Sequence, residues 1–259
     1  LPSAEAEWQE VQIPCLQSGN AAGGSRYDWY RRHLRIPAQW GGRRIFLHLS
    51  GARYAPMVFV NDREVGGQLD GWTPCEVEVT GLVEPGGLAA VMVRCQDWGA
   101  TFIEGFELPE NTLGDLREDS IMKGKLLAPI GGHWGSFGPW DDIDLVARPT
   151  QFLADVAVET SMQNHTLTIR GVVDGTPAPA RVEASVRDAG GNVLSLPPVT
   201  VPATGMWVME TAIPDAIRWW SPEDPSLYEL VLTLVSPAGA TGNLDEQRLR
   251  IGFRELWTD

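Results

Sequence analysis

The chain has 259 residues, and this length favours two domains of ordinary size. Hydrophobic residues make up 43% and charged residues 21%, and no apolar run approaches the about 20 residues that span a bilayer, which argues against disordered and membrane-spanning classes. The formal net charge of −14 repels phosphate backbones and anionic lipid, so we expect no nucleic acid and no membrane among the partners.

The cysteines and the N-terminus say little about the compartment. Cys15, Cys75 and Cys95 are too few for a disulfide scaffold and too scattered for a Cys-x-x-Cys metal site, so we expect buried free thiols and no cofactor. The sequence begins at Leu1 without an initiator Met or an apolar leader, as a trimmed or processed chain would. The compartment is left open, with a lean towards an extracytoplasmic one, periplasmic or secreted.

In the first half, apolar and polar residues alternate with a period of two, which predicts strands with one buried and one solvated face. The predicted buried faces are Tyr30, Leu34 and Ile36; Ile45, Leu47 and Leu49; Cys75, Val77 and Val79; and Ala89, Val91, Val93 and Cys95. Asn61-Asp62 lies where a tight hairpin turn is expected. No segment has the pattern of a long amphipathic helix. Residues 1–148 are therefore predicted to form a β-sandwich of jelly-roll type.

A second series of strands begins at Phe152, after a boundary predicted at residues 147–150 because Pro149 cannot donate to a sheet ladder. Its predicted faces are Phe152, Ala154, Val156 and Val158; Leu167 and Ile169; Val182, Ala184 and Val186; and Tyr228, Leu230, Leu232 and Leu234. About seven short strands in roughly 105 residues are typical of an immunoglobulin-like sandwich. The predicted fold class is all-β: a jelly-roll sandwich over residues 1–148, then an immunoglobulin-like sandwich over residues 149–259.

The common catalytic signatures are missing from the sequence. It has no phosphate-binding loop, no His-Glu-x-x-His and no Gly-x-Ser-x-Gly elbow, and the Gly-rich residues 131–138 lead into a predicted strand. No zinc-ligand spacing is present among the four histidines, His33, His48, His133 and His165. Calcium at Asp141, Asp142 and Asp144 is disfavoured, because alternation sends Asp141 and Asp142 to opposite faces. We expect no metal site.

Eleven tryptophans are the unusual feature of the composition. Four lie in or beside Gly-rich loops: Trp72, Trp98, Trp134 and Trp140. Flat indoles stack on the C–H faces of sugar rings, and loop tryptophans also plug the ends of β-sandwiches, so both roles stay open. In the second half, core and hinge positions are expected for Trp207, Trp219 and Trp220.

Two sets of residues resemble a known family. Tyr30-Arg31-Arg32, together with residues 37–47, 58–66, 71–74 and 79–80, resembles the N-terminal sugar-binding jelly roll of glycoside hydrolase family 2. That family includes β-galactosidases, β-glucuronidases and β-mannosidases. Ten consecutive residues, 219–228, followed by Arg-Ile-Gly-Phe-Arg-Glu at 250–255, are similar to the end of the family's immunoglobulin-like domain. The motifs cover residues 27–255 in the expected order.

The resemblance implies that a (β/α)8 barrel follows and carries two catalytic glutamates, the acid/base directly after an Asn. No Asn here is followed by Glu, and a barrel needs about 250 residues. We therefore expect no catalytic residue, and no activity from this chain alone. The implied function is the non-catalytic N-terminal portion of a retaining family 2 β-glycosidase, whose partners are a C-terminal barrel and, through the parent enzyme, a β-glycoside.

The resemblance also points to one loop. In several family members the first domain lends an acid to the active site, six positions before a Gly that resembles Gly138. Counting back here gives Gly132, with His133 and Trp134 beside it. The expected substrate-binding residues are His133, Trp134, Trp140 and Trp72. Two alternatives stay open: a free-standing carbohydrate-binding module and an extracellular pair of adhesion domains.

Overall fold

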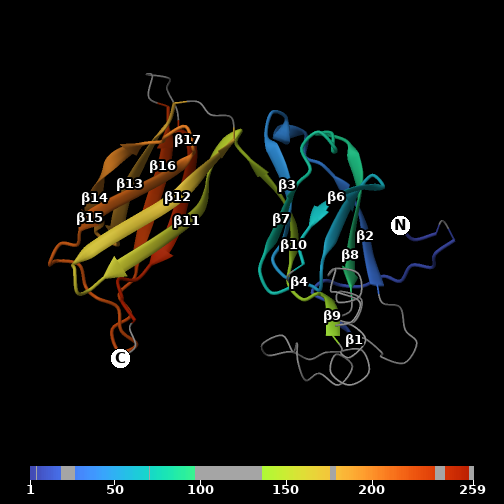
Figure 1. The fold of residues 1–259 in the computed structure, drawn as a ribbon, viewed down its shortest axis with the longest axis horizontal. Helices are drawn as coiled ribbons and strands as arrows, with labels where there is room; N and C mark the ends of the chain where they lie inside the picture. The colour runs from blue at the N-terminus through green and yellow to red at the C-terminus, as the bar shows by residue number, and fades with distance from the viewer. Residues whose placement is uncertain are drawn as a thin grey trace, which may run out of the picture. The chain divides into compact units, whose positions relative to one another are not determined.

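The computed structural model describes residues 1–3, 5–18, 27–69, 71–96, 136–175, 179–236 and 243–256 (Figure 1). The chain divides into two compact units, Leu1–Ala147 and Arg148–Asp259. Within the described ranges the regular structure consists of β-strands and one 3-10 turn, η1 (Ala38–Trp40), which confirms the predicted all-β class. Among these residues no helix is long and apolar enough to cross a membrane.

The described residues of unit 1 form two main sheets and a small one. The first has the order β2-β8-β5-β6, formed by β2 (Tyr27–Arg35), β8 (Leu88–Gln96), β5 (Met57–Val60) and β6 (Arg63–Gly67). The second has the order β10-β3-β7, formed by β10 (Ile143–Arg148), β3 (Arg44–Leu49) and β7 (Cys75–Glu78). A third sheet, β1-β9-β4, contains β1 (Gln17–Ser18), β9 (Ser136–Pro139) and β4 (Ala52–Arg53).

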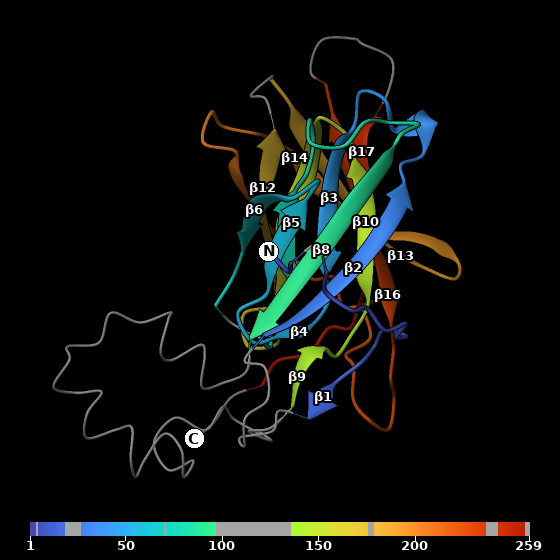
Figure 2. The ribbon, with the colours of Figure 1, turned by 90° about the vertical axis from the view of Figure 1, so that its right-hand side faces the viewer.

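The core of unit 1 lies between the two main sheets. It contains the predicted faces of β3, β7 and β8 in full, together with Tyr30 and Ile36, while Leu34 packs against its edge. Figure 2 shows β2 and β8 side by side, and their antiparallel register runs from Tyr27↔Gln96 to Arg35↔Leu88. The alternation of apolar and polar residues along these strands of unit 1 therefore predicts their buried faces correctly.

The turn predicted at Asn61-Asp62 joins β5 to β6. Both residues are left-handed, with φ of 50° and 64°, as a two-residue type I′ hairpin turn requires. The Asn61 side chain donates to Leu82 O at 3.0 Å and accepts from Ala90 N at 3.0 Å. The asparagine therefore fixes this turn against two other segments of the unit.

The described residues of unit 2 form a sandwich of seven strands. One sheet is β11-β12-β15, formed by β11 (Gln151–Ser161), β12 (Thr166–Gly175) and β15 (Met206–Ala212). The other is β14-β13-β16-β17, formed by β14 (Gly191–Thr200), β13 (Arg181–Asp188), β16 (Tyr228–Val235) and β17 (Asn243–Ile251). Both sheets contribute to one core, which includes the predicted faces of β12, β13 and β16.

The predicted face of β11 is wrong, because the strand contains a bulge. The register with β12 shifts between Ala154 and Ala157, and Asp155 there has a φ of 49°. Leu153, not Phe152 or Ala154, belongs to the core before the bulge, while Val156 and Val158 pack against the core after it. An extra residue in one strand reverses the alternation of side chains, so the four residues do not share a face.

The segment after β17 is tied back onto unit 2 by side chains and backbone. Phe253 is fully buried, lies edge-on to Trp219 and Tyr228, and accepts a backbone hydrogen bond from Trp220. The carboxylate of Glu255 accepts hydrogen bonds from Met162 N at 2.6 Å, Gln163 N at 3.1 Å and the Ser161 hydroxyl. Glu255 therefore caps the turn between β11 and β12.

Candidate functional site

The structure brings together two of the predicted site residues, Trp72 and Trp140. Their ring centroids are 6.1 Å apart and the rings are inclined at 44°. Trp140 is half-buried, and its Nε1 donates to Gly71 O at 2.8 Å. Trp72 keeps 40% of its surface exposed. Trp140 therefore acts as a packed plug, whereas Trp72 presents an indole surface to solvent.

Two glycines make this close packing possible. A Cβ at Gly51 would lie 2.4 Å from the indole of Trp140, and a Cβ at Gly71 would lie 2.4 Å from Cβ of Arg53. The carbonyl of Gly51 also accepts hydrogen bonds from the backbone N–H groups of Trp140 and Asp141. The absence of a side chain allows the backbone at Gly51 to approach the ring of Trp140, and the backbone at Gly71 to approach Arg53.

Arg53 completes the cluster and was not predicted. It lies on β4, opposite Gly138 of β9, and only 5% of it is exposed. Its guanidinium lies over Trp72 at 4.7 Å and over Tyr54 at 5.4 Å, a cation–π geometry that fixes the indole. The available sequence signal was a lone Arg between Gly51 and Tyr54, and such a segment is also typical of an ordinary turn.

The other two predicted residues, His133 and Trp134, lie outside the described residues, as does Trp98. The strand predicted to follow the Gly-rich stretch is present as β9, which begins at Ser136. The cluster that the structure does show consists of Arg53, Tyr54, Trp72 and Trp140. An exposed indole beside a guanidinium can stack on the C–H face of a sugar ring and donate to its hydroxyls.

The remaining reactive side chains of the described residues form no second centre. In those parts of the chain no group of three His, Cys, Asp or Glu side chains could hold a metal ion. Cys75 and Cys95 are buried free thiols as expected, and burial raises the pKa of both, which keeps them inert; Cys15 is only half-buried. Neither thiol therefore has the properties of a nucleophile.

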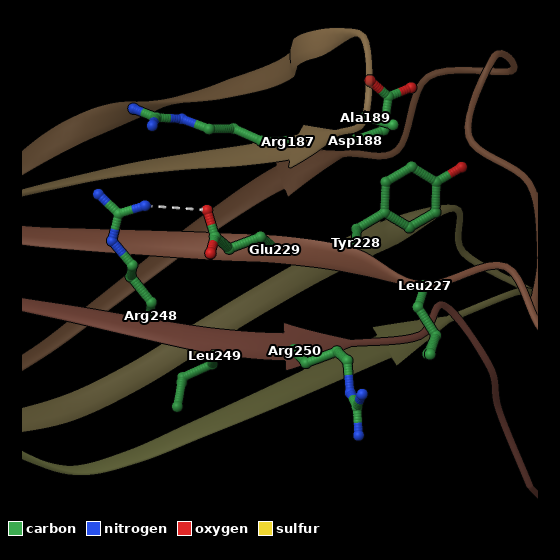
Figure 3. Close-up of a pocket in the computed structure, with 9 residues that line it drawn as sticks. All are labelled: Arg187, Asp188, Ala189, Leu227, Tyr228, Glu229, Arg248, Leu249 and Arg250. Atoms are coloured by element: carbon green, nitrogen blue, oxygen red, sulfur yellow. Dashed lines mark hydrogen bonds and ion pairs between the residues drawn. The ribbon is translucent and has the colours of Figure 1, made fainter.

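A shallow groove of about 390 Å³ lies at the ends of β13, β16 and β17. Figure 3 shows the side chains that line it. Arg187, Arg248 and Arg250 line it, but Arg248 pairs with Glu229 at 3.2 Å and with Glu246 at 2.8 Å. With Asp188 also present, carboxylates balance the guanidinium charge. None of the predicted site residues lines this groove, and its charge favours no particular ligand.

Comparison with known proteins finds a family model that matches unit 2. The model of the family described as "Glycosyl hydrolases family 2" matches residues 151–254, which span the strands of unit 2 and the segment after β17. Residues 151–254 match glycosyl hydrolase family 2. This confirms the resemblance seen in the sequence. Unit 1 precedes this match in the order that the resemblance implied.

The matches to curated relatives extend over both units. A β-glucuronidase of Felis catus is 25% identical over 264 residues, which cover 95% of this chain and 39% of that protein. A β-glucuronidase of Paenibacillus borealis is 21% identical over 232 residues, covering 88% and 36%. The β-galactosidase large subunit of Leuconostoc lactis is 24% identical over 207 residues, covering 78% and 28%. The chain thus spans about a third of the length of these curated relatives.

Solved structures share the fold of this chain. A β-glucuronidase of Bacteroides uniformis has a TM-score of 0.70 at 21% identity, over 95% of this chain and 29% of that one. A glycosyl hydrolase family 2 member of Bacteroides cellulosilyticus has a TM-score of 0.66 at 18% identity, over 96% of this chain and 33% of that one. At these identities the likeness establishes the fold.

Proposed function

We propose that this chain is the non-catalytic N-terminal portion of a retaining family 2 β-glycosidase, which supports a (β/α)8 barrel and helps to complete its active site. The observation that carries the proposal is a family 2 match in a chain that spans about a third of its relatives. Retaining hydrolysis needs two carboxyl groups about 5–5.5 Å apart. In this proposal the barrel supplies both of them, and the chain supplies none.

The proposed contribution to substrate binding comes from the end of unit 1 that carries β4 and β9. Trp72 offers an exposed indole there, and Arg53 and Trp140 hold it in place. We include His133 and Trp134, which precede β9 in the sequence by three and two residues. The substrate is a β-glycoside, and the names of the relatives favour a β-glucuronide or a β-galactoside.

The test uses the parent protein with its barrel, so that activity can be measured. His133→Ala, Trp134→Ala and Trp72→Ala should each lower kcat/KM by about tenfold or more, which is about 1.4 kcal/mol of transition-state stabilisation. Their melting temperatures should stay unchanged. Leu69→Ala is the matched control, because Leu69 is 54% exposed on the same connection as Trp72. Full activity in all three variants, or losses that only follow lost folded protein, would refute the role in binding.

The exposed indole of Trp72 also suits a free-standing carbohydrate-binding module, which is the second candidate function. The two candidates differ in what the chain does without a barrel. A dissociation constant below about 100 μM for a monosaccharide or disaccharide, lost in Trp72→Ala, would favour the binding module. Weaker binding favours the support role, since the sugar then needs the barrel for enclosure.

A further inference from the structure

We propose that β15 is a self-association edge: two copies of this chain pair their β15 strands antiparallel, which joins two three-stranded sheets of unit 2 into one sheet of six strands. β15 is the outermost strand of the sheet β11-β12-β15, and among the described residues no strand pairs with its outer edge. Figure 1 shows it at the border of unit 2, next to β14 of the other sheet. The proposal goes beyond the proposed function and needs no barrel.

The backbone of β15 presents hydrogen-bonding groups along this outer edge. In an antiparallel pair, residues that bond to the neighbouring strand alternate with residues whose N–H and C=O point away from it. Val173 N donates to Gly205 O at 2.9 Å, just before β15 begins. Ile213 N donates to His165 O at 2.7 Å, just after it ends, and both bonds continue the register of β12 and β15. The odd-numbered residues of β15 therefore bond to β12, and the even-numbered ones direct their backbone groups outwards, where a second strand can bind them.

The solvent-facing side chains of β15 are unusually apolar for an edge strand. Met206 is 62% exposed and Val208 is 58% exposed, and no other described strand has two large apolar side chains so exposed. Val172 of β12 lies opposite Met206 and is itself only half-buried, so the apolar surface extends onto the next strand. Edge strands are normally protected from pairing by charged residues, prolines or bulges. β15 has an unbroken register, no proline and one charged residue, Glu210.

The other sheet edges of unit 2 carry the protection that β15 lacks. β14 contains Pro197 and Pro198, which have no N–H to donate, and its register with β13 shifts there. Four of the nine residues of β17 are charged. The edge of β11 is bridged to β17 at the bulge, where Leu153 N donates to Asp245 and Gln247 donates to Leu153 O. Within unit 2, β15 of a second copy is therefore the edge that β15 can pair with, and this two-fold contact closes on itself as a dimer.

The charges near β15 select the register of the pair. A two-fold axis through Val208 puts this valine opposite its own copy and puts Glu210 opposite Met206 of the second copy. The two Glu210 carboxylates then lie four residues apart, about 13 Å along the strands. Moving the axis one residue towards Glu210 brings them to diagonal positions about 7–8 Å apart, and moving it two residues puts like charges directly opposite, which is destabilising. Arg170, beside Val208 on β12, is paired with Glu159 at 2.6 Å and adds no net charge at the axis.

Sedimentation of the chain at concentrations of about 5–500 μM measures the association. We expect a reversible monomer–dimer equilibrium with a dissociation constant of about 10–100 μM, because one strand pair is at the small end of interface sizes. Val208→Glu puts two carboxylates opposite each other on the axis and should raise the constant at least about tenfold. The melting temperature of the monomer should not change, since Val208 is exposed. Val193→Glu is the matched control, because it makes the same change at an exposed valine of β14, and it should leave the constant within about twofold.

Hydrogen exchange locates the interface on the strand. The N–H of Met209 bonds to β12 and should exchange slowly at every concentration, whereas the N–H of Val208 points outwards and should exchange more slowly only as the dimer forms. The proposal is overturned if the chain stays monomeric at about 500 μM. It is equally overturned if the Val208→Glu and Val193→Glu variants dimerise as tightly as the unchanged chain, or if exchange at Val208 does not depend on concentration, because the copies would then meet at another surface.

Discussion

Replacing Gly51 by alanine should destabilise unit 1 by overpacking the indole of Trp140. The new Cβ would lie 2.4, 2.5 and 2.7 Å from three ring carbons of Trp140, all closer than van der Waals contact permits. Overpacking of this kind costs about 1–3 kcal/mol. If the indole moves, its hydrogen bond to Gly71 O is lost as well, and a half-buried donor without a partner costs about 1 kcal/mol more. We expect a total loss of about 2–4 kcal/mol.

Gly41→Ala is the matched control, because a Cβ at Gly41 meets only Ala38 O at 3.7 Å and its φ is −52°. The same substitution there should be neutral or stabilising by up to about 1 kcal/mol, because alanine reduces the conformational entropy of the unfolded chain. Urea unfolding gives both free energies, and the Trp140 indole N–H signal in an NMR spectrum reports the ring position. A Gly51→Ala variant as stable as Gly41→Ala, with the indole signal unmoved, would refute this account of the cluster.

Three further outcomes are expected. Glu255→Ala should lower the free energy of unfolding of unit 2 by about 2 kcal/mol, because it removes a charged acceptor from two backbone N–H groups. The control is Glu223→Ala at an exposed position, which should change this free energy by less than about 0.5 kcal/mol. Equal effects of the two substitutions would contradict the capping role of Glu255. The hydrogen bond from Arg44 holds the pKa of Glu78 below its usual 4.5, so this carboxylate stabilises the fold at neutral pH and loses that contribution as the pH falls through the lowered pKa. Because the Glu78 side chain is 39% exposed, Glu78→Gln should lower the free energy of unfolding by under about 1 kcal/mol at pH 7 and leave it unchanged in strong acid. Urea unfolding at both pH values is the measurement, and a loss that is the same at both would contradict the link between the Glu78 pKa and stability. Finally, the purified chain should hydrolyse none of a panel of nitrophenyl β-glycosides, because the proposed function assigns the paired carboxylates to the barrel, and turnover that survives repurification would disprove this.

Local alternation was enough to predict most of the fold. The faces of β3, β7, β8, β12, β13 and β16 follow from a period of two, because each of these strands buries one side in a single core. The bulge at Asp155 could not be predicted in this way. Leu153 N donates to the side chain of Asp245, and Gln247 donates to Leu153 O, so residues more than 90 positions away hold the displaced strand.

The candidate site was predictable only in part, for the same reason. Composition and loop position singled out Trp72 and Trp140, but the contact between them depends on the indole N–H of Trp140 reaching Gly71 O, 69 positions away. Arg53 is buried by the pairing of β4 with β9, which no local pattern encodes. The resemblance to family 2 came from ten consecutive residues and the later Gly-Phe-Arg segment, which the structure joins through Trp219, Trp220 and Phe253.

The central claim, that this chain supports the barrel of a family 2 β-glycosidase, is tested most directly by sequencing the coding frame downstream of the codon for Asp259. The account predicts an uninterrupted frame of at least about 250 codons that alternates strands and helices and contains a Glu directly after an Asn at the end of a predicted strand. A stop codon immediately after Asp259 in the native gene would contradict the claim and leave a binding protein in its place.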